Sequence, residues 1–137
     1  MIVVDASVAV KWFSSENGRL EALALLEGTT KLLAPALIRV EVAAALVKKA
    51  RLGQISVEAA KGTLIAWHEA ALGGSIVLVP DEFDLLEAGH LSLALQHPIY
   101  DCLYLALAKR HGIPLVTADA NFVARAASLY PEIRSLV

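Results

Sequence analysis

The chain has 137 residues, of which 57% are hydrophobic and only 6% aromatic, and its net charge at pH 7 is −2. This length suits one domain with an aliphatic core, and charged residues recur too often for the roughly 18-residue apolar run of a membrane helix. The single cysteine, Cys102, excludes an internal disulfide framework. Because no basic leader precedes the first apolar residues, we expect a cytoplasmic protein that does not contact a membrane.

The first half of the chain alternates apolar runs typical of buried strands with patterns of helical spacing. Pro35 follows the second apolar run and suits the first turn of a helix, and Gly53 suits the end of that helix. The expected strands are residues 2–4 and 31–34, and the expected helices are residues 7–13, 18–28, 36–53 and 56–72.

The second half continues this alternation. Its expected strands are residues 76–79, 113–119 and an edge strand within 132–137, and its expected helices are residues 81–97, 99–112 and 121–130. Strands that alternate with helices form right-handed crossovers, so the pattern predicts a mostly parallel central sheet of four to five strands with helices on both faces. We therefore predict one α/β domain over residues 1–137.

Two acidic residues fall where open parallel sheets bind ligands, beyond the carboxyl ends of the strands, and a third stands at a helix N-terminus that we expect near the same edge. Asp5 ends the first strand, Asp119 ends the strand at 113–119, and Asp101 stands in the first turn of the helix at 99–112. Taken singly, Asp5 and Asp119 are best interpreted as helix caps, and Asp101 as a complement to the helix dipole.

Glu41 does not fit a capping role. Its helical neighbours Leu37, Ala44 and Ala45 form an apolar and mostly small face, and Arg39 lies about 200° away around the helix. A carboxylate on a core-facing stripe is costly unless it is paired or bound to a metal. Glu41 therefore requires a partner.

The four acids together favour a different interpretation. Independent caps need not gather at one end of one sheet, and converging carboxylates repel one another unless a cation neutralises them. Ligands that are all oxygen select hard divalent ions such as Mg²⁺ or Mn²⁺. Such ions activate water and stabilise the transition state of phosphodiester hydrolysis.

Four motifs carry a resemblance to a known family: "VVDASV", Glu41 in a helix after "LAP", "YDCLYLALA" and "LVTADANF". In this order and at this spacing, over essentially the whole chain, they resemble the PIN-domain ribonucleases, most closely the VapC-type toxins of toxin–antitoxin pairs. The resemblance implies a PIN-like fold and a metal-dependent endoribonuclease that hydrolyses RNA. The acids that would hold Mg²⁺ or Mn²⁺ and carry catalysis are Asp5, Glu41, Asp101 and Asp119.

The resemblance also implies partners and supporting residues. Family members often cleave structured RNA such as tRNA, are inhibited by a cognate VapB-type antitoxin, and form homodimers. Ser7, Thr117 and Asn121 would orient an acid, a water or a phosphate. The chain departs from the family pattern at Cys102, where alanine is usual, and at Asn121, where some relatives have another acid, which weakens the case for a second metal.

Basic residues supply candidate contacts to an RNA backbone. Setting aside the four candidate acids leaves ten of the 14 acidic residues against 12 basic ones, so the net charge does not exclude RNA. Lys109 and Arg110 are better explained as complements to a helix C-terminus. The candidate RNA contacts are Lys11, Lys48, Lys49 and Arg51.

Other side chains are expected to be structural. The histidines share no metal spacing and are expected at the surface or at helix ends, whereas Trp12, Trp67, Tyr100 and Tyr104 are expected to pack in the core. Two alternative functions stay open. One is a phosphotransfer domain of receiver or haloacid-dehalogenase type, although no second aspartate lies two residues after Asp5. The other is a non-catalytic PIN-like binding domain.

Overall fold

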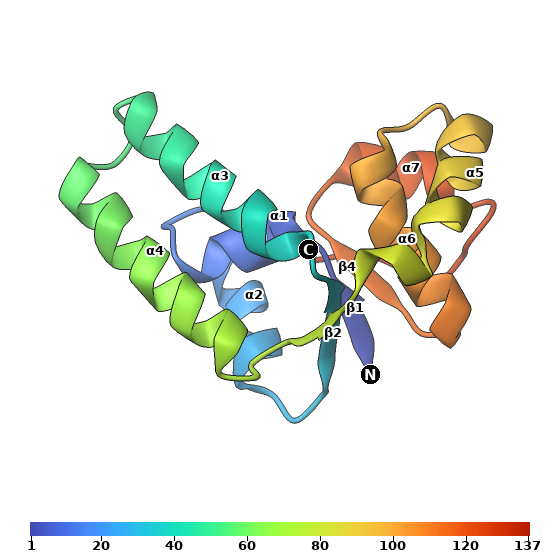
Figure 1. Cartoon of the computed structure of the whole chain (residues 1–137), viewed down its shortest axis with the longest axis horizontal. Coiled ribbons are helices and arrows are strands. Elements are labelled where there is room, and N and C mark those ends of the chain that lie inside the picture. The colour runs from blue at the N-terminus through green and yellow to red at the C-terminus, as the bar shows by residue number, and fades with distance from the viewer.

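The computed structural model describes residues 1–137 and contains one five-stranded sheet in which every strand pair is parallel (Figure 1). The strand order is β3-β2-β1-β4-β5, so β1 is central. This sheet confirms the predicted fold class, including the final edge strand. The strands are β1 (Ile2–Val4), β2 (Leu32–Pro35), β3 (Val77–Val79), β4 (Leu115–Thr117) and β5 (Ile133–Ser135).

Helices cover both faces of the sheet, with α1 to α4 on one side and α5 to α7 on the other (Figure 1). The 3₁₀ helix η1 (Val10–Trp12) extends α1, and η2 (Asp81–Phe83) precedes α5. No helix is both long enough and apolar enough to span a membrane. The α-helices are α1 (Ala6–Ala9), α2 (Arg19–Glu27), α3 (Ile38–Arg51), α4 (Val57–Leu72), α5 (Leu85–Leu95), α6 (Ile99–His111) and α7 (Ala120–Ala126).

The order of the strands creates a topological switch point between β1 and β4. From β1 the chain proceeds outward through β2 to β3, then returns through α5 and α6 to β4 on the other side of β1. At such a point the helices that follow the two neighbouring strands diverge to opposite faces, and a crevice opens beyond their carboxyl ends. The fold therefore places Asp5, which follows β1, next to the residues that follow β4.

Helix α6 is the most buried helix, with every residue from Cys102 to Ala108 buried. It packs against β1, β2 and β4, and α5 covers its other side. This explains why the helix is apolar almost throughout rather than amphipathic. Its first turn carries Asp101. Trp12 and Trp67 also lie in the core, with ring centroids 6.4 Å apart, as predicted.

The structure corrects two predictions about local structure. Pro35 is the last residue of β2 instead of the first turn of a helix, because β2 continues until it pairs with Val79. Helix α3 begins later, and the backbone N–H of Leu37 before it donates to Asp81 Oδ1 at 3.0 Å. This cap comes from a residue remote in sequence, so no local pattern indicates it.

The predicted helix at 81–97 is interrupted at Asp84. Asp84 is buried, and its carboxylate accepts hydrogen bonds from Arg110 Nε at 2.7 Å and Nη2 at 3.0 Å. This bidentate pair joins the start of α5 to the last turn of α6 and raises the pKa of Arg110. Arg110 and Lys109, which pairs with Glu87, therefore have structural roles, in line with the sequence-based interpretation.

We expect Arg110→Ala to lower the free energy of unfolding by about 2 kcal/mol, because it leaves the buried Asp84 carboxylate without its donor. Urea denaturation of the parent and the variant measures the difference. The matched control is Lys109→Ala, which removes an exposed ion pair and should change stability by less than about 0.5 kcal/mol. Equal effects of the two variants would show that the Asp84 pair is not structural.

Candidate functional site

Asp5 is a buried carboxylate at the end of the central strand, with 4% of its surface exposed. Its Oδ1 accepts the Ser7 hydroxyl at 2.5 Å and caps α1 by accepting the Val8 N–H at 3.3 Å. Burial raises its pKa from the usual 3.8 to about 6, although hydrogen bonds from Ser7 and Thr117 oppose the shift. Asp5 is therefore both the predicted cap and an uncompensated buried acid.

The partner that Glu41 requires is Tyr104 of α6. The Tyr104 hydroxyl donates to Glu41 Oε1 at 2.5 Å. Burial raises the pKa of Glu41 despite this bond, and the charge of Asp101 raises it further. Burial and the Glu41 charge likewise raise the pKa of Tyr104, so its hydroxyl remains a donor. Tyr104 lies in the core as predicted, whereas Tyr100 is 60% exposed and that prediction was wrong.

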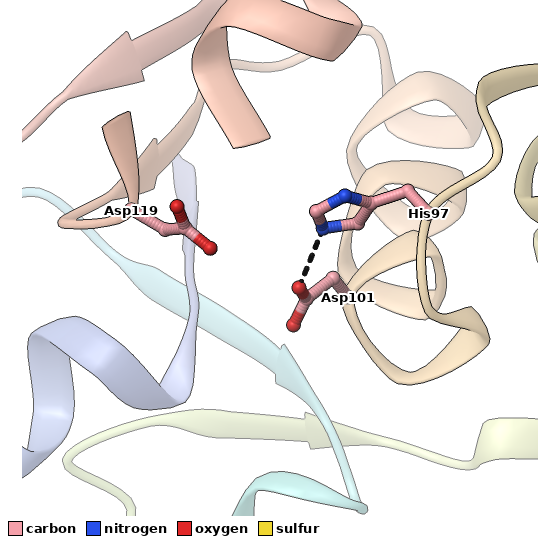
Figure 2. Close-up of side chains that lie close together, drawn as sticks. All are labelled: His97, Asp101 and Asp119. Carbon is pink, nitrogen blue, oxygen red and sulfur yellow. Dashed lines mark hydrogen bonds and ion pairs between the residues drawn. The ribbon is translucent and has the colours of Figure 1, made fainter. Parts of the chain in front are cut away.

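Asp101 and Asp119 face one another beside His97 (Figure 2). One ligand atom from each of the three side chains lies within 4.8 Å of the others. His97 Nε2 is 2.7 Å from Asp101 Oδ2. His97 follows the end of α5, which agrees with the expected helix-end position, but it is buried, with its ring stacked on Phe122 at 4.5 Å. The one local signal for this contact is the four-residue spacing between His97 and Asp101.

The segment after β4 is held by hydroxyl groups. Asp119 Oδ1 caps α7 by accepting the N–H groups of Asn121 at 3.0 Å and Phe122 at 3.1 Å. Ser7 Oγ accepts the Ala118 N–H at 2.9 Å, and Thr117 Oγ1 accepts the Asp119 N–H at 3.1 Å. Ser7 Oγ also lies 3.4 Å from Thr117 Oγ1, so the two hydroxyl groups connect the segment after β1 to the end of β4. Asn121 is exposed and contributes its backbone to this region.

The four predicted acids occupy one region but do not form a single tight cluster. Asp101 and Asp119 belong to the group within 4.8 Å that also contains His97, and Asp5 and Glu41 lie outside that group. The charge of Asp101 nevertheless raises the pKa of both Asp5 and Glu41, so the acids interact across the site. None of the four pairs with a lysine or arginine. Their negative charge is therefore not balanced by a lysine or an arginine.

A groove of about 580 Å³ extends from Glu41 and Asp119 over α1 and α3. Three of the predicted RNA contacts line it, whereas Arg51 lines a separate hollow between α3 and α4. The groove residues with charged or hydroxyl side chains are Ser7, Lys11, Glu16, Glu41, Lys48, Lys49 and Asp119.

Glu16 is a groove residue that the sequence prediction missed. Its carboxylate lies 3.1 Å from Lys49 Nζ and 3.8 Å from Lys11 Nζ, and it accepts the Ser14 hydroxyl. Although burial opposes the shift, the bonds from Ser14 and Lys49 lower the pKa of Glu16. Its position in an irregular loop before α2 gives no pattern that would have identified it.

The five-stranded parallel sheet and the acidic switch point define a known class of fold. The chain matches the model of the PIN domain over residues 2–128, and it belongs to the PIN-domain family. No curated protein matches the chain.

Three solved structures share this fold. PAE2754 from Pyrobaculum aerophilum has 26% sequence identity and a TM-score of 0.69, with 90% of this chain and 78% of that chain covered. VapC20 from Mycobacterium tuberculosis, a sarcin-ricin loop cleaving toxin, has 16% identity and a TM-score of 0.68, with 90% of this chain and 94% of that chain covered. A toxin–antitoxin complex from Klebsiella pneumoniae has 16% identity and a TM-score of 0.66, with 100% of this chain and 98% of that chain covered.

We expect Asp5→Asn to stabilise the metal-free protein at neutral pH. The folded-state pKa of Asp5 is raised to about 6, so the folded protein binds this proton more tightly than the unfolded chain does. The associated stability is present below about pH 4 and is lost as the pH rises through 6. Asparagine keeps the cap but carries no charge. The free energy of unfolding of the variant, relative to that of the parent, should therefore rise by about 2–3 kcal/mol between pH 4 and pH 7.5.

Chemical denaturation in EDTA at both pH values measures this gain. Glu58→Gln, which changes an exposed acid on α4, serves as the control and should show no such dependence on pH. A variant that is less stable than the parent at pH 7.5 would contradict the assignment of an ionised, uncompensated Asp5.

Proposed function

We propose that the protein is a Mg²⁺- or Mn²⁺-dependent endoribonuclease and the toxin of a toxin–antitoxin pair. The observation that carries this proposal is the set of acids at the carboxyl ends of β1 and β4, none of which has a lysine or arginine partner. Carboxylate oxygens are the ligands that hard divalent ions prefer, so the residues fit such an ion. Membership of the PIN-domain family supports the same activity.

In this proposal Asp5, Glu41, Asp101 and Asp119 hold the metal. When bound, a divalent ion lowers the pKa of a water molecule and stabilises charge that develops on a phosphodiester. The protein supplies orientation: the Ser7 and Thr117 hydroxyl groups hold Asp5, and Tyr104 holds Glu41. The nearby groove lysines offer charge to the RNA backbone. The role predicted for Asn121 stays a prediction, because its side chain is exposed outside the groove lining.

The test is cleavage of structured RNA by the purified protein in Mg²⁺, Mn²⁺ or EDTA. We expect cleavage with either metal and none in EDTA, and Asp5→Asn and Asp101→Asn should lower the rate at least about 100-fold. Gel analysis of end-labelled RNA measures the rate. Circular dichroism shows that the variants fold, and Glu58→Gln is the control that should cleave like the parent.

Four outcomes would count against this function. Cleavage that persists in EDTA, or full activity of Asp5→Asn, would exclude the metal-dependent mechanism. Phosphorylation of Asp5 by a small phosphodonor such as acetyl phosphate would instead favour the phosphotransfer alternative. Metal binding without any cleavage of RNA or DNA would favour a PIN-like binding domain.

The proposed partners have separate support. The Klebsiella pneumoniae structure is a toxin–antitoxin complex with this fold, which supports an antitoxin partner. We propose that this partner is of the VapB type and blocks the groove. We also propose a homodimer, through the apolar side chains that α5 leaves in solvent. Leu85, Leu86 and Leu93 are 52%, 76% and 74% exposed and surround Gly89, so a second copy would cover them. A cytoplasmic location is consistent with a toxin that acts on cellular RNA.

The groove lysines generate a further prediction about RNA affinity. Glu16 lies between Lys11 and Lys49 and neutralises part of the charge that a phosphate would contact. Glu16→Gln should therefore tighten RNA binding in EDTA about 3- to 10-fold. Lys49→Gln should weaken RNA binding and lower the number of counterions released, measured from the salt dependence of the affinity, by about one. Fluorescence anisotropy of a labelled structured RNA at several salt concentrations measures both effects.

Glu58→Gln is the matched control for total charge, because it removes one negative charge outside the groove lining. It should change the RNA affinity by less than about twofold. If Glu16→Gln and Glu58→Gln had the same effect, the groove would not be the RNA-binding surface.

A further inference from the structure

We propose that His97 is a positioning residue for Asp101: it fixes that carboxylate by a hydrogen bond and leaves one oxygen free for the metal. The proposal rests on the metal-dependent function proposed above. It assigns His97 a role beside the four acids. Two contacts of the imidazole ring support this role: its face stacks on Phe122, and its Nε2 meets Asp101.

The imidazole of His97 is held in place independently of Asp101. Only 7% of the residue is exposed, and its ring stacks on Phe122 with an interplanar angle of 7°. The backbone is fixed as well, because the His97 N–H donates to the Ser92 carbonyl at 3.3 Å and its carbonyl accepts the Ser92 hydroxyl at 2.6 Å. His97 is thus anchored to α5 through its backbone and to α7, the helix that Asp119 caps, through its ring.

The hydrogen bond defines the role of each atom. His97 Nε2 is 2.7 Å from Asp101 Oδ2 (Figure 2). In the proposed arrangement the carboxylate oxygen accepts, and the hydrogen of this bond is carried by Nε2. A nitrogen that carries a hydrogen has no free lone pair for a metal, so in this arrangement Nε2 acts as a donor to the Asp101 carboxylate and not as a ligand. The second oxygen, Asp101 Oδ1, remains available.

Electrostatics explain why Asp101 needs this donor. Its side chain is 31% exposed and carries a negative charge that acts on both Asp5 and Glu41. Without a fixed donor, repulsion from these acids favours rotamers that turn the carboxylate toward solvent. Carboxylates that ligate metals are commonly oriented in this way by a second residue, and losing the orienting bond typically costs 10- to 100-fold in metal affinity.

The experiment compares the Mn²⁺ affinity of the whole protein and of three variants, measured by EPR of free Mn²⁺ without RNA. Gln places an amide N–H near the position of Nε2, whereas Phe keeps the stacking on Phe122 but has no donor. We expect His97→Gln to bind Mn²⁺ within about threefold of the parent and His97→Phe to bind it 10- to 100-fold more weakly. His90→Phe, which changes an exposed histidine of α5, should bind like the parent.

A second measurement needs no variant. Pulsed EPR of the parent loaded with Mn²⁺ should show no nitrogen bound directly to the metal. A directly bound nitrogen, together with equal loss of affinity in His97→Gln and His97→Phe, would make His97 a ligand and overturn the proposal. Parent-like affinity of His97→Phe would overturn it as well. His97→Leu is a second variant without a donor, used if thermal melts in EDTA show that His97→Phe is unfolded.

The outcome separates this inference from the function on which it rests. If the parent bound no Mn²⁺, the proposed metal-dependent function would fail. If the parent bound Mn²⁺ and cleaved RNA but His97→Phe did the same, only the role of His97 would be rejected.

Discussion

The candidate site depends on one constraint: carboxylates of like charge lie close together at the edge of a sheet without a lysine or arginine partner. Each acid instead has a hydrogen-bonding partner of its own. Ser7 and Thr117 bond to Asp5, Tyr104 bonds to Glu41, His97 contacts Asp101, and backbone N–H groups of α7 bond to Asp119. These donors fix the carboxylates but do not cancel their charge, so burial still raises the pKa of Asp5 and Glu41.

The donors also connect the site to the core. Tyr104 and Thr117 are almost fully buried, and His97 is held between α5 and α7, so the carboxylates are attached to packed elements on both faces of the sheet. A site on such rigid elements keeps its geometry before any ligand arrives. The repulsion between the carboxylates and the stability of the surrounding core therefore belong to one arrangement. A bound cation would relieve the repulsion without disturbing the core.

Much of the site could be predicted because its residues follow strands. A buried strand such as β1 is visible as a β-branched run, and in a parallel sheet the residue after it must lie at the carboxyl edge. Asp5 and Asp119 were predictable for this reason, and Glu41 because a carboxylate on an apolar helical face requires a partner. The partner itself was not predictable, because Tyr104 lies 63 residues away and meets Glu41 only once the sheet has brought α3 and α6 into position.

By itself, the sequence determined the alternation of strands and helices, the parallel sheet, and the four acids at one edge of it, because these depend on periodicity and on chain direction. Only the tertiary structure decided which hydrogen-bonding group meets each acid. It also decided that His97 is buried beside Asp101, that Glu16 lies between two groove lysines, and that Asp81 caps α3. Such contacts join residues whose distance is set by packing, and no local pattern along the chain records them.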